Sequence, residues 1–166
     1  MENLKIEIYT DGACSGNPGK GGYGVVLLYG KHRKELSGGY QLTTSNRMEL
    51  QAAIKALETL KKACPVKMYS DSQYLVNSMT KGWVENWKAK NWRKSDKDKV
   101  KNVDLWEKLL ELCKKHQVEF QWIKGHNGEG ENERCDFLAK SALQAEVLEK
   151  DEGYQNEPDL LLFNEK

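Results

Sequence analysis

The chain contains 166 residues, of which 31% are charged, with 26 lysines and arginines against 25 aspartates and glutamates. This length fits one domain with a sizeable hydrophobic core, and the near balance of charge does not by itself indicate a polyanionic partner. The four cysteines lie far apart without C-x-x-C spacing, which argues against a zinc cluster and a disulfide framework. No apolar run approaches the roughly 20 residues of a membrane span, so the sequence favours a soluble cytoplasmic protein.

The first part of the chain has the pattern of three antiparallel strands. Apolar residues alternate with polar ones from Leu4 to Thr10, which is typical of a strand with one buried face. Short glycine-containing connections separate this segment from two further strand-like stretches, at residues 22–30 and 35–42. Because short connections favour antiparallel neighbours, this part of the sequence predicts a three-stranded meander.

The remaining elements alternate between helix and strand. A helical apolar stripe begins at Asn46, an N-cap candidate that Glu49 follows three residues later, and extends to about Lys62. The next expected elements are a strand at 65–70, a helix at 72–79, a helix at 103–116, a strand at 118–125 and a last helix to about residue 148. A meander followed by this alternation predicts an α/β domain whose mixed sheet is covered by helices.

Charge is distributed unevenly towards the C-terminus. Residues 81–101 carry a local net charge of +5, whereas residues 146–166 carry −5. We assign the domain to residues 1–150 and predict that the acidic stretch 151–166 is a flexible tail. The apolar residues 160–163 within this tail are a candidate docking segment for this or another protein.

Four acidic side chains are expected to meet at one edge of the sheet. Asp11 and Asp71 each follow a strand, and ligands of α/β sheets gather outside the C-terminal ends of strands. Glu49 shares a helical face with apolar residues three, four, seven and eleven positions later, so it is expected to point towards the sheet. Asp136 lies at the edge of the apolar side of the last helix.

Each acid also has a local interpretation when it is taken alone. Asp71 can cap the following helix, Glu49 can complete a capping box, Asp11 can serve a turn, and Asp136 can be a surface charge. Taken together, like charges in one crevice raise one another's pKa and destabilise the fold unless a cation is bound. Oxygen-only ligands favour a hard divalent cation, and Mg²⁺ is the usual intracellular one.

The motifs YTDGACSGNPG, TTSNRMEL, YSDSQY, KGH and ENERCD occur in this order, and with them the chain resembles the type 1 ribonucleases H of bacteria over residues 4–155. The resemblance implies a five-stranded mixed sheet, with three antiparallel strands and then two parallel to the first, flanked by helices. It also implies an endonuclease that hydrolyses the RNA strand of RNA–DNA hybrids, leaving 5′-phosphate and 3′-hydroxyl ends, and that acts in replication and repair.

The resemblance implies a role for each acidic residue in a site for two Mg²⁺ ions, which Mn²⁺ can replace. Asp11 bridges both ions, Asp136 helps to hold the ion that activates water, and Glu49 and Asp71 hold the ion on the leaving-oxygen side. His126 in KGHNGEG matches a mobile histidine that assists proton handling or product release, although a histidine between glycines is also typical of an exposed loop. Glu133 is expected to have an auxiliary role.

The resemblance also implies contacts with a hybrid whose shape and 2′-hydroxyls are read without marked sequence specificity. The expected substrate-binding residues are Cys14, Gly16, Asn17, Thr44, Ser45, Asn46, Gln73, Trp83, Trp87, Lys88, Lys90, Arg93 and Lys94. Ser45 departs from the asparagine common at its position in the family, so Asn17 would share its work. Trp83 and Trp87, four residues apart, are expected to form an aromatic face, whereas Trp92 or Trp106 is expected to anchor the basic segment to the core.

Two other functions are compatible with parts of this pattern. The same fold class occurs in integrase-type and resolvase-type nucleases, which also bind metal through acids. A noncatalytic hybrid-binding module is the second alternative, but it predicts the loss of a metal ligand and all four acids are present. We expect a monomer whose partner is the RNA–DNA hybrid.

Overall fold

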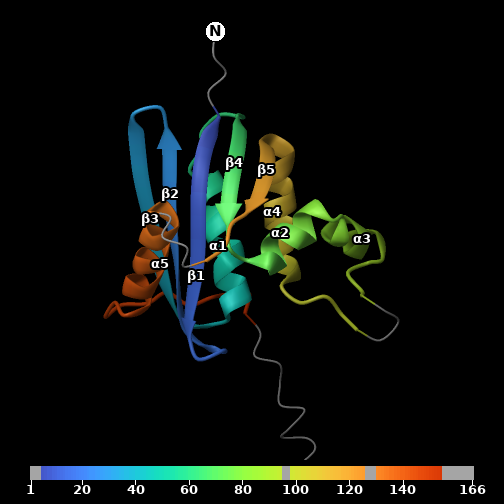
Figure 1. The fold of residues 1–166 in the computed structure, drawn as a ribbon. Helices are drawn as coiled ribbons and strands as arrows, with labels where there is room; N and C mark the ends of the chain where they lie inside the picture. Colours follow the sequence, from blue (N-terminus) through green and yellow to red (C-terminus); the bar gives the residue numbers. More distant parts are fainter. Residues whose placement is uncertain (1–4, 95–97, 126–129, 155–166) are drawn as a thin grey trace, which may run out of the picture.

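The structure, a computed structural model, describes residues 5–94, 98–125 and 130–154. Its centre is a five-stranded sheet in the order β3-β2-β1-β4-β5 (Figure 1). The strands are β1 (Ile6–Ser15), β2 (Gly19–Tyr29), β3 (His32–Thr43), β4 (Pro65–Ser70) and β5 (Gln117–Trp122). Strands β1, β2 and β3 pair antiparallel, and β4 and β5 run parallel to β1. The predicted mixed sheet is therefore confirmed.

Helices cover both faces of this sheet. They are α1 (Ser45–Glu58), α2 (Gln73–Thr80), α3 (Trp83–Ala89), α4 (Val103–Lys115) and α5 (Gly130–Leu143). Successive residues of a strand point to opposite faces, and on β2 the positions of Gly21 and Gly22 face Met48 of α1 and Ala139 of α5 respectively. Figure 1 shows α5 in front of β2 and β3, α1 behind the sheet, and α3 projecting away from the body.

The main hydrophobic core lies between the sheet and the helices α1 and α4. Ile8, Met48, Leu57 and Trp106 are completely buried in it. The apolar stripe that the sequence predicts for α1 forms this contact, since every alanine and leucine from 50 to 57 in that helix is buried. Burial of such a stripe against the strands holds the N-terminal end of α1 next to β1.

Both ends of α1 and the end of α5 differ from the prediction, and α1 ends at Glu58, with Thr59 as its C-cap, rather than near Lys62. The helix α1 begins one residue earlier, because the Thr44 hydroxyl is the N-cap and accepts a hydrogen bond from the Arg47 backbone N–H at 3.2 Å. The prediction of Asn46 as the N-cap is therefore wrong, and Glu49 is not part of a capping box. The helix α5 ends at Leu143 rather than near 148, because Glu149 pairs with β3 by backbone hydrogen bonds to Gly39 and Gln41.

The chain continues to pack on the domain after this pairing. Asp151 is buried and forms an ion pair with Arg47. The first described residues of the predicted tail are thus held against the domain, and residues 155–166 lie outside the described residues. Within the described part of the chain, no helix is both long enough and apolar enough to cross a bilayer.

Candidate active site

Three of the predicted acids form one tight group. Carboxylate oxygens of Asp11, Glu49 and Asp71 all lie within 4.8 Å of one another. The parallel register brings Asp11 and Asp71 together, because Thr10 of β1 lies opposite Ser70 of β4 and each of these residues is followed by one of the two aspartates. Residues at the C-terminal ends of neighbouring parallel strands share one edge of the sheet.

Glu49 reaches this edge because α1 contacts β1 without an intervening side chain. A Cβ atom on Gly12 would lie 2.6 Å from the backbone nitrogen of Glu49 and 2.8 Å from the Cβ atom of Met48. Any residue larger than glycine would therefore push the helix away from the strand. The close approach brings the carboxylate of Glu49 to that of Asp11.

The fourth acid, Asp136, lies beside this group on α5. Asp11 pairs across the sheet with Gly24, whose missing side chain lets the backbone of Cys135 and Ala139 pack against β2. Cross-strand partners share a face of the sheet, so Asp11 and Asp136 are on the same side. Asp136 is partly exposed and forms an ion pair with Lys140 at 3.0 Å.

The acids oppose one another's ionisation. Burial raises the pKa of Asp11 to about 8, and the negative charges of Asp71 and Asp136 add to this effect, as does a side-chain hydrogen bond with Asp136. Burial also raises the pKa of Glu49 well above its usual range, with further contributions from Asp11 and Asp71. Without a cation, the site therefore favours protonated carboxyls near neutral pH.

The group has the chemistry of a metal site. The Oε1 atom of Glu49 is buried and has no hydrogen-bond partner among the described residues. A buried acceptor without a donor is costly, and a cation among three carboxylates satisfies it. The donors are oxygen atoms only, so the cluster can hold a hard divalent cation.

The local interpretation of Asp71 as a helix cap does not hold. The N-cap of α2 is Ser72, whose hydroxyl accepts from the Leu75 N–H at 3.1 Å. The backbone carbonyl of Asp71 instead accepts a hydrogen bond from the Trp122 indole N–H at 3.2 Å. Trp122 was not predicted from the sequence to lie at this site. The feature that indicates it is the parallel pairing of β4 and β5, which places Trp122 opposite Ser70.

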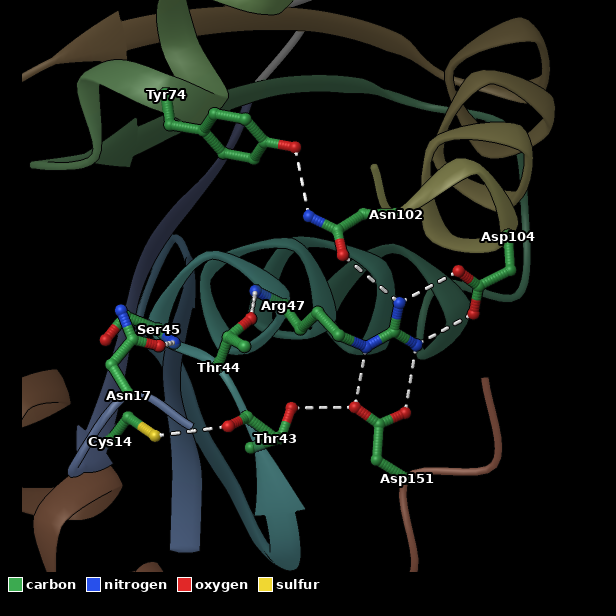
Figure 2. Close-up of polar contacts among 10 residues, drawn as sticks. All are labelled: Cys14, Asn17, Thr43, Thr44, Ser45, Arg47, Tyr74, Asn102, Asp104 and Asp151. Carbon is green, nitrogen blue, oxygen red and sulfur yellow. Dashed lines mark hydrogen bonds and ion pairs between the residues drawn. The ribbon is translucent and has the colours of Figure 1, made fainter. Parts of the chain in front are cut away.

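Several expected substrate residues gather at the start of α1 (Figure 2). The Asn17 side chain accepts a hydrogen bond from the Ser45 backbone N–H at 3.1 Å, and the Cys14 thiol contacts the Thr43 carbonyl at 3.5 Å. Gly16 has φ 81°, a left-handed conformation that glycine adopts without strain. Asn46 and Gln73 are exposed. The turn before β2 and the N-terminus of α1 thus form one polar surface.

The expected aromatic face on α3 is not a single surface. Trp83 is exposed at 42%, but Trp87 packs against the core, with its ring centroid 6.1 Å from that of Trp106. Trp106 is buried in the core and Trp92 is partly buried against it, in agreement with the expectation that one of them is an anchor. The four basic residues expected to contact substrate, Lys88, Lys90, Arg93 and Lys94, are all exposed.

Two predicted residues contribute less to the described geometry. His126 lies outside the described residues. Glu133 is exposed in the first turn of α5, the helix that also carries Asp136. Their roles remain predictions.

Known proteins with this sequence pattern have the same fold and the same family assignment. The family model described as RNase H matches residues 3–144. This chain belongs to the RNase H family. A ribonuclease H of Syntrophus aciditrophicus is 62% identical over 150 residues, covering 90% of this chain and 87% of that protein. Ribonuclease HI of Synechocystis is 55% identical over 90% of this chain and 94% of its own length.

Solved structures of the RNase H family agree with this assignment. LC9-RNase H1 superposes with a TM-score of 0.76 at 29% identity, covering 86% of this chain and 74% of that one. LC11-RNase H1, solved in complex with an RNA/DNA hybrid, has a TM-score of 0.64 at 27% identity and covers 84% of this chain and 96% of its own. The predictions of the family, of the fold and of ribonuclease H activity are confirmed, and integrase-type activity is not favoured.

Proposed function

We propose that this chain cleaves the RNA strand of RNA–DNA hybrids as an endonuclease with two divalent metal ions, Mg²⁺ in the cell, which Mn²⁺ can replace. The observation that carries the proposal is the buried, unpartnered Oε1 atom of Glu49 within a group of three carboxylates. Bound divalent cations activate the attacking water and stabilise the leaving oxygen of an in-line displacement.

The arrangement of the acids supports a division of roles. Asp11 has acidic neighbours from different elements. Its carboxylate groups with those of Glu49 and Asp71, and it also interacts with Asp136 of α5 through charge and a side-chain hydrogen bond. Asp11 is therefore the residue suited to bind both ions. Glu49 and Asp71 would hold the ion on the leaving-oxygen side, and Asp136 would help to hold the ion at the attacking water.

The surface beside the acids supports hybrid binding. The polar group at Asn17, Thr44 and Ser45 lies on one side and presents hydrogen-bonding groups at the N-terminus of α1. The basic segment around α3 projects from the other part of the domain (Figure 1). Contacts to sugars and phosphates at both places recognise an A-form-like duplex by shape, with little sequence specificity.

Compartment and assembly also belong to this proposal. We expect a cytoplasmic monomer, with residues 160–163 able to recruit a protein partner. His126 would assist proton handling or product release, and Glu133 would have an auxiliary role there.

The test is cleavage of a labelled RNA–DNA hybrid by the purified protein, beside duplex DNA of the same sequence. We expect metal-dependent cutting of the RNA strand alone, with 5′-phosphate and 3′-hydroxyl ends. Glu49→Gln should abolish cleavage, whereas Glu58→Gln, at an exposed position of the same helix, should not. Cutting of both DNA strands, or full activity of Glu49→Gln, would contradict the proposal.

A further inference from the structure

Arg47 connects three segments of the chain at the start of α1 (Figure 2). Its Nε and Nη2 atoms donate to the two carboxylate oxygens of Asp151 at 2.7 and 2.9 Å. Its Nη1 and Nη2 atoms donate to Asp104 at 2.9 and 2.8 Å, and Nη1 also donates to Asn102 at 3.4 Å. These contacts use every N–H donor of the guanidinium. The arginine is therefore held in one orientation.

The same network holds the chain on both sides of Thr44. The Thr43 hydroxyl donates to the Asp151 carboxylate at 2.7 Å, and the Thr43 carbonyl accepts from the Cys14 thiol. On the other side, the backbone N–H of Arg47 donates to the Thr44 hydroxyl. Asp151 thus contacts the residue before this N-cap and the side chain of a residue after it. One carboxylate from the C-terminal segment therefore contacts the chain on both sides of the turn at Thr43–Thr44, where β3 ends and α1 begins.

The opposite side of the network reaches α2 and α3. The Asn102 amide donates to the Tyr74 hydroxyl at 3.1 Å, and the Trp106 indole donates to the same oxygen at 3.0 Å. Tyr74 follows Gln73 in α2, and the Trp106 ring contacts Trp87 of α3. A continuous set of contacts therefore joins the turn at Thr44 to the helix that carries the basic segment.

Stability alone does not account for this arrangement. The side chains of Arg47 and Asp151 are both 2% exposed, so each charge has lost its hydration. The cost of removing two charges from water offsets much of their attraction, and apolar replacements of buried ion pairs are often neutral or stabilising. What an apolar pair cannot supply is a fixed direction for five hydrogen bonds from three segments.

We propose that Asp151, acting through Arg47, is a positioning residue for hybrid binding that sets the turn at Thr43–Thr44 relative to α2 and α3. This inference depends on the proposed function, because the turn and α3 are its two expected substrate surfaces. Asp151 contacts no group of the acidic cluster that the structure describes. Its removal should therefore weaken substrate binding and leave the chemical step unchanged.

The test compares Asp151→Asn with wild type in steady-state cleavage of a hybrid. We expect KM to rise about tenfold, the loss of one well-placed contact, while kcat changes by less than about twofold. Asp151→Glu, which retains the charge, should restore part of the affinity. Hybrid affinity measured by fluorescence anisotropy in an Asp11→Asn background should fall by the same factor as KM rises.

A control separates positioning from loss of stability. Val66→Ala removes two methyl groups at a buried site at the start of β4, away from the network. Urea unfolding measured at several temperatures identifies one at which both variants are fully folded, and the KM values are compared at that temperature. An Asp151→Asn KM equal to that of Val66→Ala and wild type would overturn the inference, whereas absence of wild-type cleavage would contradict the proposed function instead.

A second variant covers the case in which Asp151→Asn does not fold. Asp104→Asn weakens the partner of Arg47 that is 45% exposed, so it should cost less stability. We expect a KM increase of about threefold with kcat retained. An unchanged KM in this variant would also overturn the inference.

Discussion

Gly12 and Glu49 are in direct backbone contact beside the acidic cluster, since a methyl group on Gly12 would lie 2.6 Å from the Glu49 nitrogen. A second glycine, Gly24, has the same relationship with α5, where a methyl group would contact the Cys135 carbonyl. The two helices that carry Glu49 and Asp136 therefore rest directly on strand backbone. The absence of a side chain at Gly12 and Gly24 therefore determines how closely the helices that carry the acids approach the sheet.

The first prediction concerns this spacing. Gly12→Ala should destabilise the fold by about 1–3 kcal/mol, because the added methyl group forces α1 away from β1. It should also reduce cleavage more than the loss of folded protein explains, since Glu49 moves with the helix. Urea unfolding and activity at saturating Mg²⁺ measure the two effects.

Gly130→Ala is the matched control for that prediction. A Cβ atom on Gly130 meets no atom of the described residues within 4 Å, and the residue begins α5. Alanine there should be neutral or stabilise by up to about 1 kcal/mol. Equal activity and stability in Gly12→Ala and Gly130→Ala would show that the close approach is not required.

The second prediction concerns the pH dependence of the metal-free protein. Burial and the neighbouring acids raise the pKa of Asp11 to about 8 in the folded state, above its ordinary value of 3.8. The folded state therefore binds a proton more tightly than the unfolded state, and this contribution to stability is present below pH 4 and is lost as the pH rises towards 8. Urea unfolding in EDTA should show Asp11→Asn becoming more stable relative to wild type across this range.

Mg²⁺ should reverse the ranking of those two proteins. Cation binding to the folded state should raise the melting temperature of wild type. Asp11→Asn lacks the carboxylate that we propose binds both ions, so it should respond weakly and show no cleavage. Calorimetric titration at pH 6 and pH 8 should give tighter binding at the higher pH, because protons compete for the carboxylates. Stronger binding at pH 6 would contradict the assignment.

The third prediction concerns His116, which is buried between α4 and β5. Its Nδ1 accepts the Cys64 backbone N–H at 3.3 Å, and its Nε2 has no hydrogen-bond partner among the described residues. Burial, with the positive charge of Lys115, lowers the pKa of His116 below 6.5. Its contribution to stability is therefore present above pH 6.5 and is lost as the pH falls through the lowered pKa.

His116→Asn tests this dependence, because asparagine keeps an acceptor for Cys64 and does not titrate. Unfolding free energies measured from pH 8 to pH 5 should fall more steeply for wild type than for the variant. Parallel curves would show that His116 remains neutral throughout this range or is already charged when folded.

The fourth prediction separates two tryptophans of α3. Trp83→Ala should weaken hybrid binding while changing stability by less than about 0.5 kcal/mol, because its ring is exposed. Trp87→Ala should cost about 2–4 kcal/mol, because its ring packs against Trp106 and the core. Anisotropy with a labelled hybrid and urea unfolding distinguish the two effects, and the opposite pattern would contradict the packing.

Local pattern in the sequence was sufficient for most of the fold. The period-two alternation near Ile8 and the apolar stripe of α1 report which side of each element is buried, and burial is what joins the elements. The strand at Pro65–Ser70 was predicted with its observed bounds for this reason. The grouping of Asp11, Glu49 and Asp71 could be predicted because each follows a strand or lies on a buried helical face, and the family motifs matched at these positions.

Long-range contacts decided what local pattern could not. The N-cap at Thr44, the early end of α5 and the burial of Trp87 each depend on a neighbour distant in sequence or on competition between adjacent caps. Arg47 and Asp151 are 104 positions apart in the sequence, and no periodic pattern of residues indicates that they pair. A side-chain pattern records which face of an element meets apolar surroundings, whereas the partner of a buried charge is set only when the elements pack together.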